Sequence, residues 1–165
     1  MRTNKIKFQQ SGFTMLEVLV AIVVLAFGLL GLAGLQADGL RNNTSAYMRS
    51  QATLMAYDML DRMRANLQGV ENGDYNSLLL NTPVDPGCIT SGCSVAQMSQ
   101  HDAFEWSQTL ANELPSGQGR VVGSGSGSVF TITVMWDDNR TGATGTDCSG
   151  DSQVDLTCFN LSSII

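Results

Sequence analysis

The chain has 165 residues, an apolar fraction of 43% and a charged fraction of only 15%. That length leaves room for one modest domain plus an extended segment. The first twelve residues contain three of the nine basic residues and no acid, and the remainder has six basic against fifteen acidic residues and no lysine. Because phosphate backbones are bound by clustered Lys and Arg, we expect no direct binding of nucleic acid.

An uncharged apolar run occupies residues 18–35. Counted from Phe13, the segment reaches the length of about 20 residues that a helix needs to cross a bilayer. It is too long for the apolar part of a cleavable secretory signal, and no A-x-A-like site follows it, so we expect an anchor that is retained. The basic residues before it, Arg2, Lys5 and Lys7, predict that residues 1–12 are cytoplasmic and that the chain beyond residue 35 is exported.

Glu17 interrupts the start of this apolar segment. A lone carboxylate within a membrane span is costly and usually functional. The alternative is that the side chain reaches the nearby headgroups from the cytoplasmic end of the span. Position alone leaves both interpretations open.

The segment KFQQSGFTMLE, residues 7–17, resembles the type III signal of type IV prepilins. By that resemblance Gly12 ends a cleaved leader, residues 1–12, and Phe13 becomes the N-terminus and is N-methylated by the prepilin peptidase. Glu17 matches the family glutamate that is thought to pair with the N-terminal amine of a neighbouring subunit and to set its register. An amine and a carboxylate in a bundle of low dielectric can compensate each other's burial, which agrees with this role.

Three glycines, Gly28, Gly31 and Gly34, recur at every third position of the span. Each weakens a helix by about 1 kcal/mol relative to alanine. Close packing of helices in the membrane would explain them, and so would local unwinding when a subunit enters a fibre, as the resemblance implies. Many major pilins carry proline at the position of Gly34, and this chain does not.

No proline occurs before Pro83, so we expect one helix over residues 13–66, about 80 Å long at 1.5 Å per residue. Residues 13–35 would form its membrane or fibre-core half, and residues 36–66 the half that packs on a head formed by residues 67–165. In this second half apolar residues recur at helical steps of three and four. They are Ala52, Met55, Ala56, Met59, Leu60, Met63 and Leu67. We expect this stripe to be the docking face for the head.

The segments QATLMAYDMLDRMRAN, residues 51–66, and VMWDDNR, residues 134–140, are similar to the family called type IV pilus modification protein PilV. The resemblance implies a minor pilin that primes assembly, joins the tip complex and serves adhesion and twitching motility. Implied partners are other minor pilins, a tip adhesin-like protein, the major pilin, the prepilin peptidase and the inner-membrane assembly machinery. The protein would first be a single-pass inner-membrane precursor with a periplasmic head, and then part of the fibre. The alternatives are a pseudopilin of type II secretion, a membrane-anchored thiol oxidoreductase or other enzyme, and an adhesive or ligand-binding head.

Residues 67–98 are rich in turn-forming residues. A short helix is predicted from Ser99, with Ser99 and Asp102 as a capping-box-like pair, to Pro115. Strands are predicted at residues 120–122, 129–136 and 154–161, the first two joined by the GSGSGS loop. The result is an α+β fold of the type IV pilin kind, with a long N-terminal helix packed on a small antiparallel sheet.

The four cysteines lie in the exported part, where an even number indicates two disulfides. Three pairings are possible, and the sequence does not choose among them. Cys88 with Cys93 and Cys148 with Cys158 are favoured because each pair brackets a short, turn-rich loop; the second resembles the C-terminal disulfide loop of pilins. A zinc site fits the spacings poorly.

Catalytic chemistry has no positive support in the sequence, so we expect no enzyme activity, metal or cofactor. His101 is the single histidine and has no evident partner set. A cluster of oxygen-bearing side chains precedes the last strand, and a solvated acidic loop explains it better than a calcium site. Its members are Asp147, Ser149, Asp151 and Asp155. Asp137 and Asp138 are expected to cap or turn the chain after the second strand.

Overall fold

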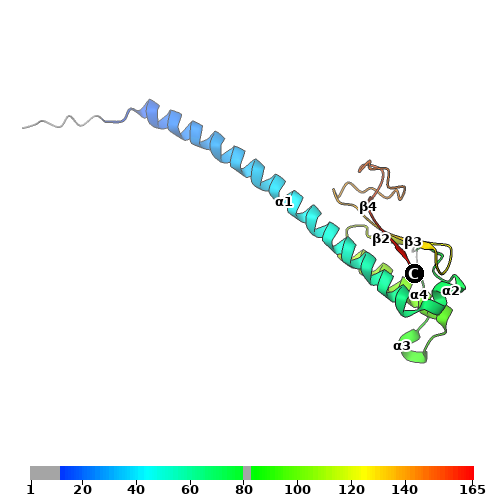
Figure 1. The fold of residues 1–165 in the computed structure, drawn as a ribbon. Helices are drawn as coiled ribbons and strands as arrows, with labels where there is room; N and C mark the ends of the chain where they lie inside the picture. Colours follow the sequence, from blue (N-terminus) through cyan, green and yellow to red (C-terminus); the bar gives the residue numbers. More distant parts are fainter. Residues whose placement is uncertain (1–11, 80–82) are drawn as a thin grey trace, which may run out of the picture. The chain divides into compact units, whose positions relative to one another are not determined.

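The computed structural model describes residues 12–79 and 83–165, so the basic leader residues lie outside the described part. Figure 1 shows the elements in chain order. They are α1 (Met15–Ala65), α2 (Leu67–Asn72), β1 (Ser77–Leu79), α3 (Cys88–Ser91), α4 (Val95–Glu113), β2 (Gln118–Val122), β3 (Val129–Trp136) and β4 (Thr157–Ile164). Contacts divide the chain into two compact units, Met1–Asn43 and Thr44–Ile165. The long helix expected over residues 13–66 runs from Met15 to Ala65.

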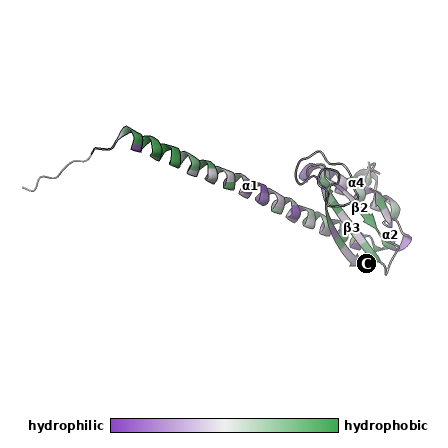
Figure 2. Cartoon of the chain, turned by 90° about the horizontal axis from the view of Figure 1, so that it is seen from above, coloured by the Kyte–Doolittle hydropathy of each residue, from purple (hydrophilic) through white to green (hydrophobic). Residues whose placement is uncertain are grey.

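The first part of α1 is apolar on every side. It is green along most of its length in Figure 2, and its large side chains are exposed in the single chain. A helix that is apolar all round must be covered by lipid or by other protein. Among the described residues, α1 is the one helix that is long and apolar enough to span a membrane by length and composition.

The second part of α1 supplies one side of the head's core. The buried side chains are Met48, Ala52, Met55, Ala56, Met59, Leu60 and Met63, each at most 5% exposed. Leu67, which was predicted to extend this stripe, is 53% exposed instead. The helical spacing does not continue to it, because α1 ends at Ala65 and α2 starts at Leu67 after the break at Asn66.

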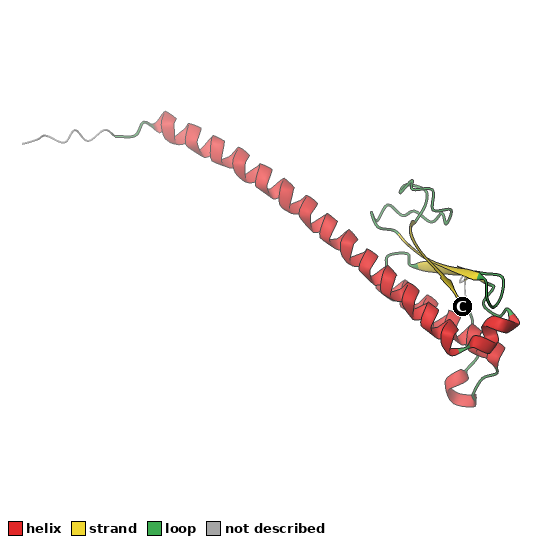
Figure 3. Cartoon of the chain, in the orientation of Figure 1, coloured by secondary structure: helices red, strands yellow, loops and turns green. Residues whose placement is uncertain are grey.

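One antiparallel sheet supplies the other side of the core. Its strands follow the order β1-β2-β3-β4, and Figure 3 shows them as the yellow arrows. On β3, which has the predicted bounds, Phe130, Ile132, Val134 and Trp136 are all buried. The α+β fold predicted from the sequence is therefore confirmed.

Strand β4 begins three residues later than predicted, at Thr157 rather than at residue 154. The preceding backbone is held by Gly145 instead of by β3. Gly145 donates its N–H to the carbonyl of Val154 at 2.9 Å and accepts a hydrogen bond from the N–H of Leu156 at 2.8 Å. Residues 154–156 therefore form a bridge within the loop, although their composition suits a strand.

Helix α4 begins at Val95, four residues before the predicted start, so the proposed capping pair Ser99 and Asp102 is wrong. Ser94 is the N-cap: its hydroxyl accepts the N–H of Gln97 at 3.3 Å, and the side chain of Gln97 accepts the N–H of Ser94 at 3.0 Å. This reciprocal pair satisfies two backbone donors at the helix start. The region predicted as turns also contains α2, β1 and α3.

Helix α4 is fixed to α1 by an aromatic anchor. Trp106 is fully buried and donates its indole N–H to the carbonyl of Met55 at 2.9 Å. The indole lies against Gly119 of β2, where an added Cβ would come within 2.6 Å of the ring. The glycine thus allows the sheet to approach the helix closely.

Two disulfides close loops of the head. Cys88 is bonded to Cys93 and Cys148 to Cys158, the pairings favoured from the sequence. The second disulfide ties the loop before β4 to that strand. Asp137 stabilises the start of the same loop, because its carboxylate accepts the N–H groups of Thr141 at 3.0 Å and Gly142 at 2.8 Å.

Candidate functional site

The Gly12–Phe13 bond lies outside the long helix. Both residues are exposed and non-helical, and Phe13 is 84% exposed. Thr14 caps the helix that follows, because the N–H of Glu17 donates to the Thr14 hydroxyl at 3.3 Å and to its carbonyl at 3.1 Å. This cap satisfies a backbone donor at the helix start. Gly12 and Phe13 therefore lie just before the first turn of the helix, in exposed, non-helical backbone.

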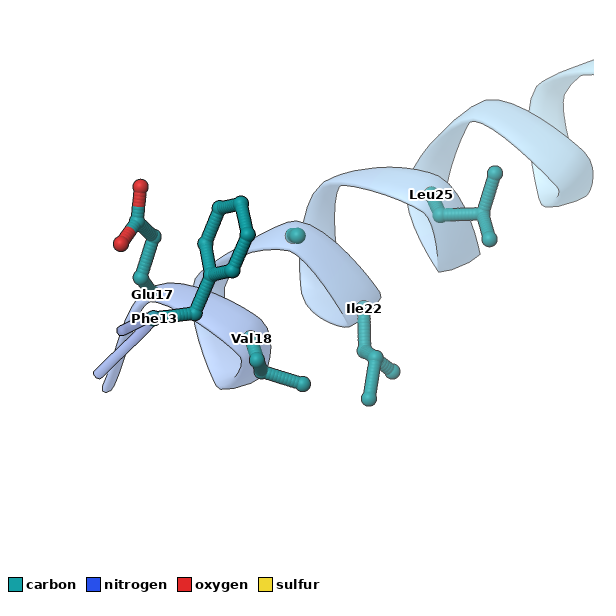
Figure 4. Close-up of a pocket in the computed structure, with 6 residues that line it drawn as sticks. Phe13, Glu17, Val18, Ile22 and Leu25 are labelled. Carbon is teal, nitrogen blue, oxygen red and sulfur yellow. The ribbon is translucent and has the colours of Figure 1, made fainter. Parts of the chain in front are cut away.

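Glu17 is the one charged residue of an otherwise apolar surface on the first turns of α1. Phe13, Val18, Ala21, Ile22 and Leu25 line this surface with it. In Figure 4 the carboxylate of Glu17 and the ring of Phe13 lie at the same end, and the aliphatic side chains follow along the helix. A carboxylate in the first turn is favoured by the helix dipole, although that interaction alone does not neutralise its charge.

No basic residue lies between Glu17 and Arg41 in the sequence. A positive charge that neutralises the Glu17 carboxylate in an apolar setting must therefore come from the chain before Glu17 or from another molecule.

The three glycines of the span have no packing partner in the described chain. A Cβ built on Gly28, Gly31 or Gly34 would meet nothing within 4 Å. All three are helical in this structure. Close helix packing and local unwinding would both involve molecules other than this chain, so the open space around the glycines favours neither explanation.

A polar network in the head was not anticipated from the sequence. Arg62 of α1 bridges Asp58 at 2.9 Å and Glu105 of α4 at 2.8 Å, and lies 3.5 Å from Asp102. Asp102 is 6% exposed and also accepts the hydroxyl of buried Tyr75. The hydrogen bond from Arg62 lowers the pKa of Glu105, while burial and the bond to Asp102 raise that of Tyr75. Asp102 and Glu105, three residues apart on α4, are the sequence feature that could have indicated this network. The sequence did not show that this side of α4 faces Arg62.

His101 joins this network at its edge. One ring nitrogen lies 3.3 Å from Asp85 and the other 3.3 Å from Glu105. The contact with Asp85 fastens the loop before the Cys88–Cys93 disulfide to α4. Across residues 12–79 and 83–165, no group of three or more His, Cys, Asp or Glu side chains is arranged to hold a metal ion.

The acidic side chains before β4 are used within their own loop. Hydrogen bonds from the hydroxyl of Ser149 and from its N–H, the latter at 3.1 Å, lower the pKa of Asp155. Asp151 accepts the N–H of Gln153 at 3.0 Å. These carboxylates therefore act as local supports of the loop.

Two family models match the chain. Residues 7–33 match the prokaryotic N-terminal methylation motif, and residues 34–104 match the model described as type IV pilin Tt1218. The first match contains the Gly12–Phe13 bond and Glu17, and the second contains the buried stripe of α1 and the first disulfide. No curated protein matches the chain, and no solved structure matches it.

Proposed function

We propose that the chain is a pilus or pseudopilus component and, more specifically, a minor pilin of the PilV type. The match of residues 7–33 to a methylation motif and of residues 34–104 to a type IV pilin model supports the first part. The protein would be non-catalytic, help to prime pilus assembly and take part in the tip complex. The observation that carries this proposal is Glu17, the single charge on the apolar first turns of α1, a helix that begins two residues after the exposed Phe13.

Processing would convert the precursor into the assembly-competent form. The prepilin peptidase would remove residues 1–12 and methylate the new amine of Phe13. The amine would then stand one turn from the Glu17 carboxylate and could pair with it or with that of a neighbouring subunit. A pair across subunits would set the axial register of α1 while its apolar surface moves from lipid into the fibre.

The proposed partners are other minor pilins, a tip adhesin-like protein and the major pilin. Before assembly the protein would be a single-pass inner-membrane protein with its head in the periplasm, as the basic leader and the apolar span favour. Afterwards it would lie in the fibre or at its tip. The Met-rich face of α1 and its similarity to PilV support the minor-pilin assignment.

The test is replacement of Glu17 by alanine in the full-length protein. We expect Glu17→Ala to abolish incorporation into pili, since a neighbouring amine would lose its counter-charge, while export and both disulfides of the head are retained. Glu71→Ala is the matched control, because Glu71 is an exposed carboxylate of α2 in the head. Immunoblots of sheared pili and of membranes give the readout, and normal incorporation of Glu17→Ala would refute the proposed role of this residue.

A pseudopilin of type II secretion is the second candidate, because it shares the methylation motif and the apolar helix. The two differ in where the protein is found. Recovery in sheared surface pili supports the minor-pilin proposal, whereas recovery only with secretion complexes assigns the protein to the pseudopilus. Recovery in sheared pili is also compatible with an adhesive head. Head variants that lose attachment while piliation is unchanged would reveal such a role.

A further inference from the structure

Strand β4 forms a long free edge of the sheet. Within residues 12–79 and 83–165 it pairs with β3 and lies at the end of the strand order. The opposite edge is β1, which has only three residues, whereas β4 has eight, TCFNLSSI, with no charge and no proline. Soluble proteins usually protect exposed edges by shortness, by charged side chains, by proline or by a covering element. Strand β4 has none of the first three protections.

An exposed apolar patch adjoins this edge. Val129 of β3 lies directly opposite Ile164 of β4, and Val122 of β2 is opposite Thr131. Because side chains alternate between faces, Val122, Val129 and Ile164 lie on the face of the sheet opposite to buried Phe130. They are 51%, 56% and 67% exposed. The patch thus reaches the free edge at Ile164.

The charge of the head indicates which strand could bind at this edge. From residue 44 onwards the sequence has five arginines against thirteen acidic residues and no lysine. Pairing of two copies through β4 would bring two strongly acidic heads together. A neutral or basic strand from a different protein avoids that repulsion, which favours a hetero-interaction over self-pairing.

We propose that β4 is a docking edge for an extended, neutral-to-basic segment of another protein, which adds a fifth strand to the sheet. Main-chain hydrogen bonds along β4 would provide most of the affinity, as in other cases of β-strand addition. An apolar side chain of the incoming strand would lie beside Ile164 and extend the patch. This interaction goes beyond the proposed pilin function, since it concerns the head and does not depend on Glu17 or on the leader.

A synthetic peptide tests the proposal with the full-length chain in detergent micelles. The probe is a capped peptide of alternating valine and threonine with a lysine at each end. We expect it to slow hydrogen exchange of β4 amides that face away from β3 by about tenfold at a concentration ten times its Kd. A peptide with the same side chains but with an N-methyl group on every main-chain amide should not bind, because neither of its edges then offers main-chain donors.

Matched variants separate edge pairing from general attraction to a basic peptide. Ile164→Lys should weaken binding about tenfold, which corresponds to loss of one partly buried aliphatic side chain. Leu54→Lys makes the same change of charge at a comparably exposed site on α1, 63% against 67%, and should bind as the parent does.

Three results would overturn the proposal: equal binding of the N-methylated peptide, protection of amides outside β4, or no binding at about 1 mM, the weak limit of specific recognition. Protection of β4 that grows with the concentration of the protein itself would assign the edge to a second copy and refute the proposed occupant. All these results are independent of piliation, so they do not bear on the Glu17 experiment.

Discussion

The buried hydroxyl of Tyr75 gives a sharp test of how the head is held on α1. Tyr75 is fully buried and donates to Asp102, while its oxygen accepts the side-chain N–H of Asn66 at 3.1 Å. Tyr75→Phe keeps the ring and removes both interactions. Asn66 retains its bond to the carbonyl of Val95 at 3.0 Å, and Asp102 retains Arg62 at 3.5 Å. The main loss is thus one hydrogen bond to a buried carboxylate.

Such a loss is expected to destabilise the head by about 2 kcal/mol, within the range for hydrogen bonds to charged groups. For a domain of this size the midpoint of thermal unfolding should fall by roughly 6 °C. The assay is thermal and urea unfolding, followed by the fluorescence of the two tryptophans and by circular dichroism. Tyr57→Phe is the control, since Tyr57 is 49% exposed and should change stability by less than about 0.5 kcal/mol.

The double variant tests whether the effect passes through Asp102. In an Asp102→Ala background the partner of the hydroxyl is absent, so Tyr75→Phe should cost clearly less than in the parent. Equal costs in both backgrounds would show that the bond to Asp102 contributes nothing. A Tyr75→Phe midpoint as high as that of Tyr57→Phe would show that the buried hydroxyl does not stabilise the head.

Three further predictions concern packing and acid stability. Gly119→Ala should lower the free energy of unfolding by about 1–3 kcal/mol, because the added methyl group would overlap the indole of Trp106. An unchanged unfolding curve or an unchanged crystal structure of the variant would contradict this prediction. Met59→Ala should lower the free energy of unfolding, measured in urea, by about 2–5 kcal/mol. Leu67→Ala should lower it by less than about 0.5 kcal/mol, because Met59 is buried and Leu67 is exposed. Burial opposes ionisation of Asp137, but hydrogen bonds from the loop lower its pKa overall. Stability from this group is therefore present above about pH 4 and is lost as pH falls through the lowered pKa, and an Asp137→Asn variant should lose less stability over that range.

The sequence was most informative where one local pattern determines one element. Strand β3 has strict alternation with large residues on one face, and both of its ends were predicted correctly. The start of α4 was misplaced because both Ser94 and Ser99 precede suitable polar residues, and only the observed hydrogen bonds distinguish them. The start of β4 depends on Gly145, a residue ten positions from Asp155 that no local pattern connects with it.

The same distinction applies to the candidate site. Gly12, Phe13 and Glu17 lie within six consecutive residues of the sequence, so a linear motif contains them. The network of Arg62, Asp102 and Tyr75 joins three separate segments, and its members become neighbours only after α4 packs on α1. The free edge of β4 likewise depends on the strand order, which the sequence does not show.

Mass spectrometry of the protein purified from cells tests the central claim most directly. We expect a chain that begins at Phe13, carries one methyl group on its N-terminal amine and contains two disulfides. Because no lysine follows Lys7 in the sequence, the N-terminus would be the one amine of the mature chain and would identify the methylated site unambiguously. An intact chain that retains residues 1–12, or a cut at another bond, would contradict the assignment as a processed pilin.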